Sequence, residues 1–253
     1  PTPGDLQESV DGGVWYTAGD QIGRLDPSGT FTWWSDSAAA PGNGPDAGKG
    51  GPGFPDALAL GPDDAIWFEH ADRGSTVISR ADTKRGLVPV KRFRTPFSVG
   101  ADGMALGPDG AVWFTQRNEG GAARREGIGR LTADGDHKRW PLPRTAAPGG
   151  LVAGPDKALW FTDRRAVGRV GTDGEVSRFP VRGSRDPRDI VLGHDKALWF
   201  TADNRVGRIT TRGRMTLWPV RGARDLSDIV PVKDGTFWLS DPGSDTVRRF
   251  TPK

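Results

Sequence analysis

Side chains able to do chemistry recur at two places in this chain, directly after and directly before short apolar runs. The residues that follow the runs are Ala18, His70, Gln116, Asp163, Ala202 and Asp241. The residues that precede them include Asp56, Asp102, Gly149, Arg188, Ser227 and Asp228, with Asp225 nearby. If the fold brings these carboxylates together, they repel one another unless a cation or an arginine compensates them. The pattern predicts a site for a hard cation such as Mg²⁺ or Ca²⁺, or a charge centre at Arg188.

His70 is the only histidine at these positions, and with Arg188 it forms the predicted catalytic pair, His70 acting as general base. The candidates for contacting a substrate are Gln116, Asp163, Asp102 and Ser227. Each prediction has a plainer alternative. His70 could be an exposed loop residue, and the Asp side chains could close the fold by accepting hydrogen bonds from strand N–H groups.

These positions line up because the chain repeats one unit six times. A tryptophan marks each unit, at Trp15, Trp67, Trp113, Trp160, Trp199 and Trp238. Each stands in a run of the type Val-Trp-Phe-Thr, and the spacings between them are 52, 46, 47, 39 and 39 residues. A period near this length, with several short strands per unit, is typical of radial β-repeats.

Residues 187–220 illustrate the unit, since they contain four short apolar runs separated by Gly and Asp turns. Such runs are antiparallel strands. We predict an all-β fold, a single domain over residues 1–253 that is a six-bladed β-propeller of four-stranded antiparallel blades. The blades are expected at about 5–35, 55–95, 100–142, 149–182, 188–220 and 228–250. The last blade has only three strands, so residues 1–4 are expected to close the ring against it.

Other repeated residues are predicted to serve the framework. The Trp and Phe side chains should form the core between blades. Arginines recur at one equivalent position, which indicates structural partners for turn carboxylates; they are Arg24, Arg80, Arg130, Arg169, Arg208 and Arg249. The connections 36–54 and 117–127 are the long insertions, and both are expected to overhang the face where the second strands end.

Composition limits the functions open to the chain. It has no cysteine, which excludes disulfides and thiolate sites, and no apolar stretch long enough to span a membrane. Its 35 basic and 32 acidic residues are interspersed, without the basic run that nucleic-acid binding needs. We expect a monomer that binds a small molecule and neither nucleic acid nor a membrane. The start at Pro1 is typical of a processed, secreted or extracytoplasmic protein, or of a trimmed chain; a cytoplasmic location stays open.

The fourth unit carries a family resemblance. It contains Gly-Pro-Asp-x-Ala-Leu-Trp-Phe-Thr-Asp at 154–163, Val-Gly-Arg-Val at 167–170 and Thr-Asp-Gly-Glu-Val-Ser-Arg-Phe-Pro-Val at 172–181. This repeat resembles the virginiamycin B lyase family, whose members have seven blades against six here, and the similarity recurs in all six units. The resemblance implies an elimination that opens the ester of a cyclic depsipeptide. In that chemistry a His removes a proton beside the ester carbonyl, and Mg²⁺ held by two Glu polarises it.

The residues of this chain match that chemistry only in part. The family's Glu-Pro-His-Gly stretch corresponds to residues 225–228, which puts Asp225 at the first Glu and Ser227 at the His. Asp241 stands near the second Glu, so the resemblance implies a metal site of Asp225 and Asp241. A neutral Ser cannot act as general base without a partner to deprotonate it. The family's base is therefore not retained.

Three functions remain open. The first is a metal-dependent lyase-like or lactonase-like enzyme acting on a lactone or cyclic ester, for which six-bladed gluconolactonases and paraoxonases are an analogy from fold. The second is a non-catalytic propeller that binds a small molecule, glycan or peptide. The third is a scaffold for protein partners.

Overall fold

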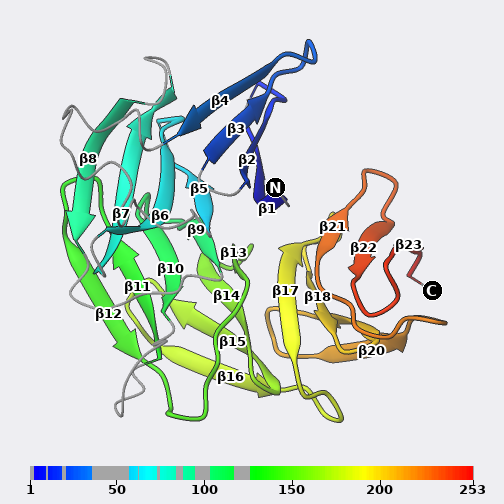
Figure 1. Cartoon of the computed structure of the whole chain (residues 1–253). Coiled ribbons are helices and arrows are strands. Elements are labelled where there is room, and N and C mark those ends of the chain that lie inside the picture. The colour runs from blue at the N-terminus through cyan, green and yellow to red at the C-terminus, as the bar shows by residue number, and fades with distance from the viewer. Residues whose placement is uncertain are drawn as a thin grey trace. The chain divides into compact units, whose positions relative to one another are not determined.

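The computed structural model describes residues 3–9, 11–18, 21–35, 57–61, 63–72, 75–83, 88–94, 103–116 and 126–252. Over these residues the fold is all-β with almost no helix, and the strands form six antiparallel sheets (Figure 1). The sheets are the blades of a six-bladed β-propeller, as predicted. No helix in this part of the chain is long and apolar enough to cross a membrane.

The chain divides into two compact units. Unit 1 comprises Pro1–Leu106, Gly110–Arg125 and Gly129–Arg139, and unit 2 comprises Gly107–Asp109, Glu126–Ile128 and Trp140–Lys253. Each unit contains blades with cores of their own. The single domain over residues 1–253 stays a prediction.

Most of the first three sheets lies in unit 1. The first contains β1 (Pro3–Glu8), β2 (Val14–Ala18), β3 (Gln21–Leu25) and β4 (Phe31–Ser35). The second contains β5 (Leu58–Leu60), β6 (Ile66–Asp72), β7 (Ser75–Asp82) and β8 (Val88–Arg94). The third contains β9 (Met104–Leu106), β10 (Val112–Gln116), β11 (Gly127–Leu131) and β12 (His137–Pro141).

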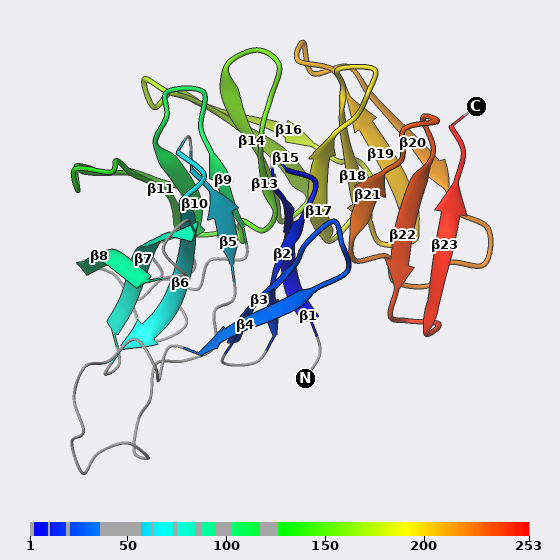
Figure 2. The ribbon, with the colours of Figure 1, turned by 90° about the horizontal axis from the view of Figure 1, so that it is seen from above.

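The other three sheets lie in unit 2, and Figure 2 shows their strands in chain order. The fourth contains β13 (Leu151–Ala153), β14 (Ala158–Asp163), β15 (Ala166–Gly171) and β16 (Val176–Pro180). The fifth contains β17 (Pro187–Leu192), β18 (Leu198–Ala202), β19 (Arg205–Ile209) and β20 (Met215–Pro219). The sixth contains β21 (Ile229–Pro231), β22 (Phe237–Asp241) and β23 (Thr246–Phe250). All six sheets fall within the blade boundaries predicted from the repeat, give or take a few residues.

The amino terminus differs from the prediction. Pro3 and Gly4 belong to β1, and Pro3 pairs with Ala18 of β2 in the first sheet. The sixth sheet has three strands in the described part of the chain. Closure of the ring by residues 1–4 is therefore not confirmed, because the residues expected to pair with the sixth sheet begin the first one.

A repeated trio holds the turn between the first and second strands of a blade. In the fourth sheet Asp156 accepts hydrogen bonds from Trp160 Nε1 at 3.0 Å and from Arg169 Nε at 2.7 Å. Burial alone would raise the pKa of Asp156, but these bonds lower it overall. A Cβ at Gly154 would lie 2.4 Å from Trp160 Cδ1, so glycine is needed for the ring to pack on the turn. The same contacts recur in the fifth sheet among Asp195, Trp199 and Arg208.

The predicted structural role of the repeated arginines is confirmed in five blades. Each arginine pairs with the carboxylate of its own turn, as in Arg24–Asp11, Arg80–Asp63, Arg169–Asp156, Arg208–Asp195 and Arg249–Asp234. These side chains belong to the scaffold.

The aromatic core between blades is also confirmed, although Phe31, Trp33 and Trp238 are exposed. In unit 2, Trp160 and Val167 of the fourth sheet cluster with Ile190, Phe200 and Ile209 of the fifth. In unit 1, Trp15 and Ile22 cluster in the same way with apolar residues of the second sheet, namely Leu58, Ile66 and Phe68. Trp238 was expected in such a core and is 46% exposed.

Candidate functional site

The residues that end the second strands of unit 2 are fixed by structural hydrogen bonds. Asp163 ends β14 and is fully buried. Its Oδ1 accepts hydrogen bonds from the N–H groups of Ala147 and Arg164, each at 2.7 Å, and its Oδ2 pairs with Arg178. Asp163, a predicted substrate-binding residue, therefore ties the connection before β13 to the end of β14.

Asp241, a predicted metal ligand, is equally committed at the end of β22. Its carboxylate accepts hydrogen bonds from Asp225 N at 2.9 Å, Ser244 Oγ at 2.6 Å and Arg248 Nε at 2.8 Å, and from Arg224 N at 3.2 Å. Burial would raise the pKa of Asp241, but these donors together hold it well below its usual range. This contact matches the plainer alternative stated above, in which an Asp side chain closes the fold by accepting hydrogen bonds from backbone N–H groups.

Arg188 is the second residue of β17, and its backbone is hydrogen-bonded to the fourth blade. Its carbonyl accepts hydrogen bonds from Thr162 Oγ1 at 2.6 Å and Gly150 N at 3.1 Å, both from the neighbouring blade. A Cβ on Gly149 or Gly150 would lie 3.1 Å from that carbonyl oxygen, so glycine at these positions lets the two blades approach closely. The backbone that presents Arg188 is thus fixed by sequence features of the blade before it.

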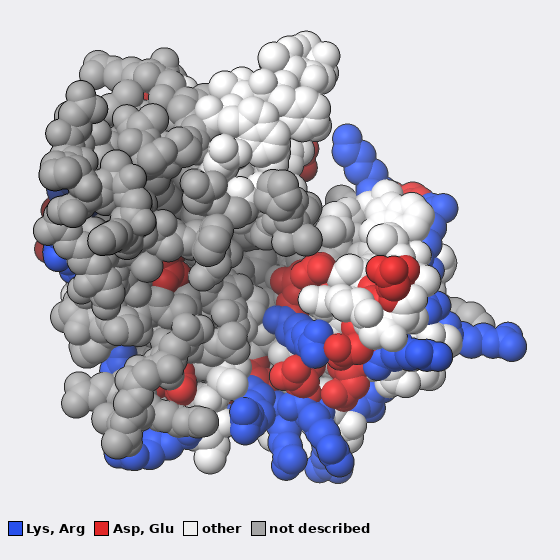
Figure 3. Space-filling model, viewed as in Figure 1, with Lys and Arg blue, Asp and Glu red and all other residues white. Residues whose placement is uncertain are grey.

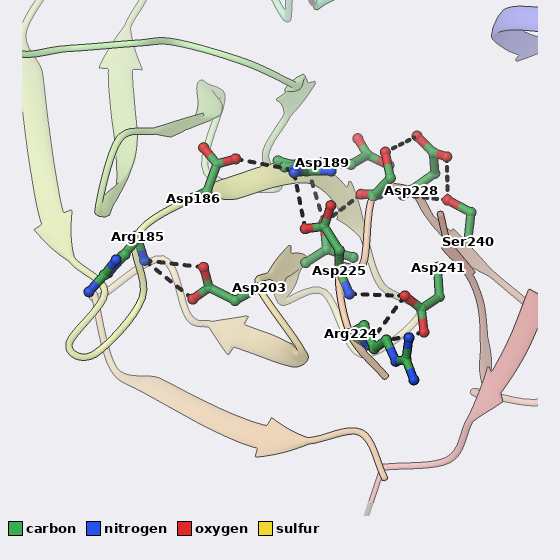
Figure 4. Close-up of polar contacts among 12 residues, drawn as sticks. Arg185, Asp186, Asp189, Asp203, Arg224, Asp225, Asp228, Ser240 and Asp241 are labelled. Carbon is green, nitrogen blue, oxygen red and sulfur yellow. Dashed lines mark hydrogen bonds and ion pairs between the residues drawn. The ribbon is translucent and has the colours of Figure 1, made fainter. Parts of the chain in front are cut away.

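The guanidinium of Arg188 bridges two carboxylates, and we call Asp186, Arg188 and Asp225 the Arg188 centre. Nε donates to Asp186 Oδ2 at 3.1 Å and Nη2 pairs with Asp225 Oδ1 at 3.0 Å (Figure 4). Burial alone would lower the pKa of Arg188, but the two carboxylates raise it, so the side chain stays a cation. The Arg188 side chain is 36% exposed. The centre therefore offers a charged donor to a ligand.

The two predicted metal ligands do not converge. Asp225 directs its carboxylate to Arg188, while only its backbone N–H reaches Asp241, as Figure 4 shows. The carboxylate of Asp241 is turned to the loop donors described above. Nowhere in the described residues do three or more His, Cys, Asp or Glu side chains come together in a way that could hold a metal ion. The donor set predicted for Mg²⁺ or Ca²⁺ therefore does not fit a cation in this arrangement.

Ser227 stands where the family's base was expected. Its hydroxyl donates to Asp228 Oδ1 at 3.4 Å, and its carbonyl accepts from Thr201 Oγ1 at 2.6 Å. Asp228 in turn accepts a hydrogen bond from Ser240 Oγ. A long contact to a carboxylate that already serves another hydroxyl is a weak means of deprotonating a serine.

Only some of the predicted site residues of unit 1 lie in the described part of the structure. Gln116 ends β10 and is buried. His70 lies in β6 and pairs with Val77 through the backbone, but its side chain lies outside the described part of the structure. Asp102, Asp56, the insertion 36–54 and most of 117–127 also lie outside it.

Sequence reasoning missed two features of the site. Asp186 was not singled out, although it stands two residues before Arg188 as Asp225 stands two before Ser227. Thr162 and Thr201 were treated as ordinary strand residues, yet both hydroxyls bind the start of the next blade. The sequence did contain a signal for these two threonines, because a Thr follows the Trp-Phe pair in three of the repeats.

Charged side chains of both signs lie on the visible surface of the protein. Figure 3 shows Lys and Arg side chains next to Asp and Glu side chains, with several Lys and Arg gathered at the lower edge of this view.

Comparison with known proteins gives the family. No curated protein matches the chain. A solved streptogramin B lyase is 28% identical, with a TM-score of 0.76, and the match covers 99% of this chain and 83% of that one. At 14% identity, a gluconolactonase from Xanthomonas campestris matches with a TM-score of 0.63, covering 94% of this chain and 82% of its own.

Calcium-binding regucalcin from Agrobacterium tumefaciens, also 14% identical, matches with a TM-score of 0.61 and covers 98% of this chain and 89% of its own. These two likenesses show the fold alone. The model of the virginiamycin B lyase family matches residues 51–253. The chain therefore belongs to the virginiamycin B lyase family.

Proposed function

We propose that this chain recognises a cyclic ester, such as a cyclic depsipeptide or a lactone, through the Arg188 centre. The observation that carries the proposal is the guanidinium of Arg188, which is charged, partly exposed and held between the carboxylates of Asp186 and Asp225. An ester carbonyl oxygen accepts hydrogen bonds, and a cationic donor gives a stronger bond than a neutral one. Family membership supports the class of ligand.

Recognition is proposed ahead of elimination because the groups needed for elimination are altered. Ser227 replaces the base, and its hydroxyl makes only the long contact to Asp228. The carboxylates of Asp225 and Asp241 are engaged by Arg188 and by loop donors. The two carboxylates that the resemblance implies as metal ligands bind groups of the protein itself, so the proposal contains no metal-dependent step.

The test is a calorimetric titration of the wild-type protein with virginiamycin B and, separately, with δ-gluconolactone. We expect saturable binding of at least one of them. Chromatography and mass spectrometry of the recovered ligand should then show the intact ring. Absence of binding with both ligands would overturn the proposal.

Ring opening is the second candidate function, favoured by the 28% identity to a streptogramin B lyase over 99% of this chain. The same mass spectra distinguish it. Elimination gives a linear isomer of unchanged mass but new retention, whereas hydrolysis adds one water. If a linear product forms with time, His70→Ala tests the base predicted from sequence: loss of the product would assign the proton transfer to His70, and an unchanged rate would remove it.

A further inference from the structure

Two connections of unit 2 carry the same motif, Val-Arg-Gly-x-Arg-Asp-x-x-Asp, at 181–189 and at 220–228. The first leads from β16 into β17 and the second from β20 into β21. In an antiparallel sheet with its strands in chain order, successive connections alternate between the two ends of the strands. The two motifs therefore lie at the same strand ends as the turns between second and third strands.

The framework explains the glycine and the second arginine's backbone in this motif. Gly183 has a φ of 72°, a conformation that favours glycine. The N–H of Arg185 donates to Asp203 Oδ2 at 3.2 Å, and in the second motif the N–H of Arg224 donates to Asp241 Oδ2, also at 3.2 Å (Figure 4). Any residue except proline offers such an N–H, so the fold does not require an arginine side chain at either position.

The arginines in the connections at these strand ends are all exposed, and we call them the arginine rim: Arg144, Arg164, Arg165, Arg182, Arg185, Arg221 and Arg224. Lysines of the described part of unit 2 stand instead in turns between first and second strands, at the opposite strand ends; they are Lys157, Lys196 and Lys233. Arginine presents a planar fork that binds an oxyanion through two parallel hydrogen bonds, whereas lysine is a point charge. The use of arginine at these ends favours recognition of carboxylate, sulfate or phosphate groups.

Carboxylates lie among these arginines and narrow the kind of partner. Asp186, Asp203 and Asp225 stand in the same connections, and their side chains are 60%, 34% and 44% exposed. Exposed carboxylate oxygens accept hydrogen bonds from hydroxyl groups. The backbone of a DNA duplex carries phosphates at every step and no hydroxyl, so these carboxylates would repel it. An acidic polysaccharide has anionic groups for the arginines and hydroxyls for the carboxylates.

We propose that the arginine rim binds an acidic polysaccharide, whose carboxylate or sulfate groups the guanidinium groups hold. The proposal does not rest on ester recognition by Arg188, and its test contains no ester. The probe is a fluorescently labelled heparin oligosaccharide, which carries carboxylates, sulfates and hydroxyls. Its binding is followed by fluorescence anisotropy in about 0.15 M NaCl, where weak long-range attraction is screened.

Two variants with four substitutions each remove the same charge from opposite strand ends. The rim variant combines Arg182→Gln, Arg185→Gln, Arg221→Gln and Arg224→Gln. The control combines exposed residues of the opposite ends, as Lys157→Gln, Arg212→Gln, Arg214→Gln and Lys233→Gln. The affinity for the oligosaccharide should fall at least about tenfold in the rim variant and less than about threefold in the control. Both thermal midpoints should stay close to that of the wild type, because all of these side chains are exposed.

A second variant with lysine at the same four rim positions separates the fork from the charge. It should also bind the oligosaccharide more weakly than the wild type does, since lysine cannot make the paired hydrogen bonds. Affinity equal to that of the wild type would contradict recognition by guanidinium groups.

Four other results would overturn the proposal. Equal losses in the rim variant and the control would show attraction by net charge alone. A labelled DNA duplex that binds the wild type as tightly as the oligosaccharide does would assign the rim to nucleic acid. Failure of the rim variant to fold would show that these side chains are structural, and absence of oligosaccharide binding by the wild type would remove the partner.

Discussion

Replacing Thr201 by Val should destabilise the protein more than the same change at Thr162. Both side chains are fully buried at equivalent positions of β18 and β14. Thr162 Oγ1 donates to the carbonyl of Arg188 at 2.6 Å, and Thr201 Oγ1 donates to the carbonyl of Ser227 at 2.6 Å. Thr201 Oγ1 also accepts the N–H of Asp189 at 3.2 Å, a second bond that Thr162 lacks.

The difference follows from the groups left without a partner. In Thr162→Val the carbonyl of Arg188 keeps its bond from Gly150 N, so about one hydrogen bond is lost, worth roughly 1 kcal/mol. In Thr201→Val the carbonyl of Ser227 and the N–H of Asp189 both lose a partner. At about 1–2 kcal/mol for each group, the cost is roughly 2–4 kcal/mol.

Thermal and urea unfolding, followed by tryptophan fluorescence and circular dichroism, measure this difference. For a chain of this size the midpoint should fall by about 2–4 °C in Thr162→Val and by roughly 5–12 °C in Thr201→Val. Thr216→Val, on the exposed outer strand β20, is the control and should stay within about 0.5 kcal/mol of the wild type. Equal stability of the two buried variants would refute the role given to these hydroxyls as ties between blades.

Three further outcomes are expected. Lys196 has a φ of 58° in the turn of the fifth blade, at a position where the third and sixth blades have glycine. Lys196→Gly should therefore raise the free energy of unfolding in urea by up to about 1 kcal/mol. A lower free energy of unfolding would contradict backbone strain at this position. Burial raises the pKa of Asp195, but hydrogen bonds from Trp199 and Arg208 lower it overall. The stability that Asp195 contributes is therefore present above about pH 4 and is lost as the pH falls through its folded-state pKa. Asp195→Asn should flatten the curve of thermal midpoint against pH below about pH 4, and parallel curves for variant and wild type would count against this. Mg²⁺ or Ca²⁺ added after EDTA should leave the thermal midpoint unchanged. A cation bound at a hundred times its dissociation constant would add about 2.7 kcal/mol, or roughly 5–10 °C. A rise of that size would show that the protein binds the metal after all.

The blades could be predicted from sequence because their signals are local. A turn Asp, a Trp four residues later and an Arg on the third strand form one contact unit, as in Asp156, Trp160 and Arg169. Repetition of that unit fixes both the strand order and the period. Closure of the ring by the amino terminus is not confirmed, since Pro3 pairs with Ala18 in the first sheet. The first few residues are too few for a pattern to show which sheet they pair with.

The site was harder to predict, because the direction of a side chain is not local. Spacing correctly placed Asp163 and Asp241 at the ends of second strands. Spacing could not show that loop N–H groups and the side chains of Arg178 and Arg248 already bind the oxygens of these two carboxylates. The sequence pointed to Arg188 as a cation that compensates these carboxylates. It did not show that Asp225, 37 positions further on and in another blade, is one of its partners.

The most direct test of ester recognition by Arg188 is a calorimetric titration of virginiamycin B into wild type, Arg188→Gln and Arg212→Gln. Gln keeps hydrogen-bonding atoms at position 188 and removes the charge, and Arg212 is an exposed turn residue of the same blade. A charge-assisted hydrogen bond is worth about 1.5–3 kcal/mol, so the affinity of Arg188→Gln should fall by about 10- to 150-fold while Arg212→Gln binds as the wild type does. Equal affinity of Arg188→Gln and wild type would contradict the role assigned to the Arg188 centre.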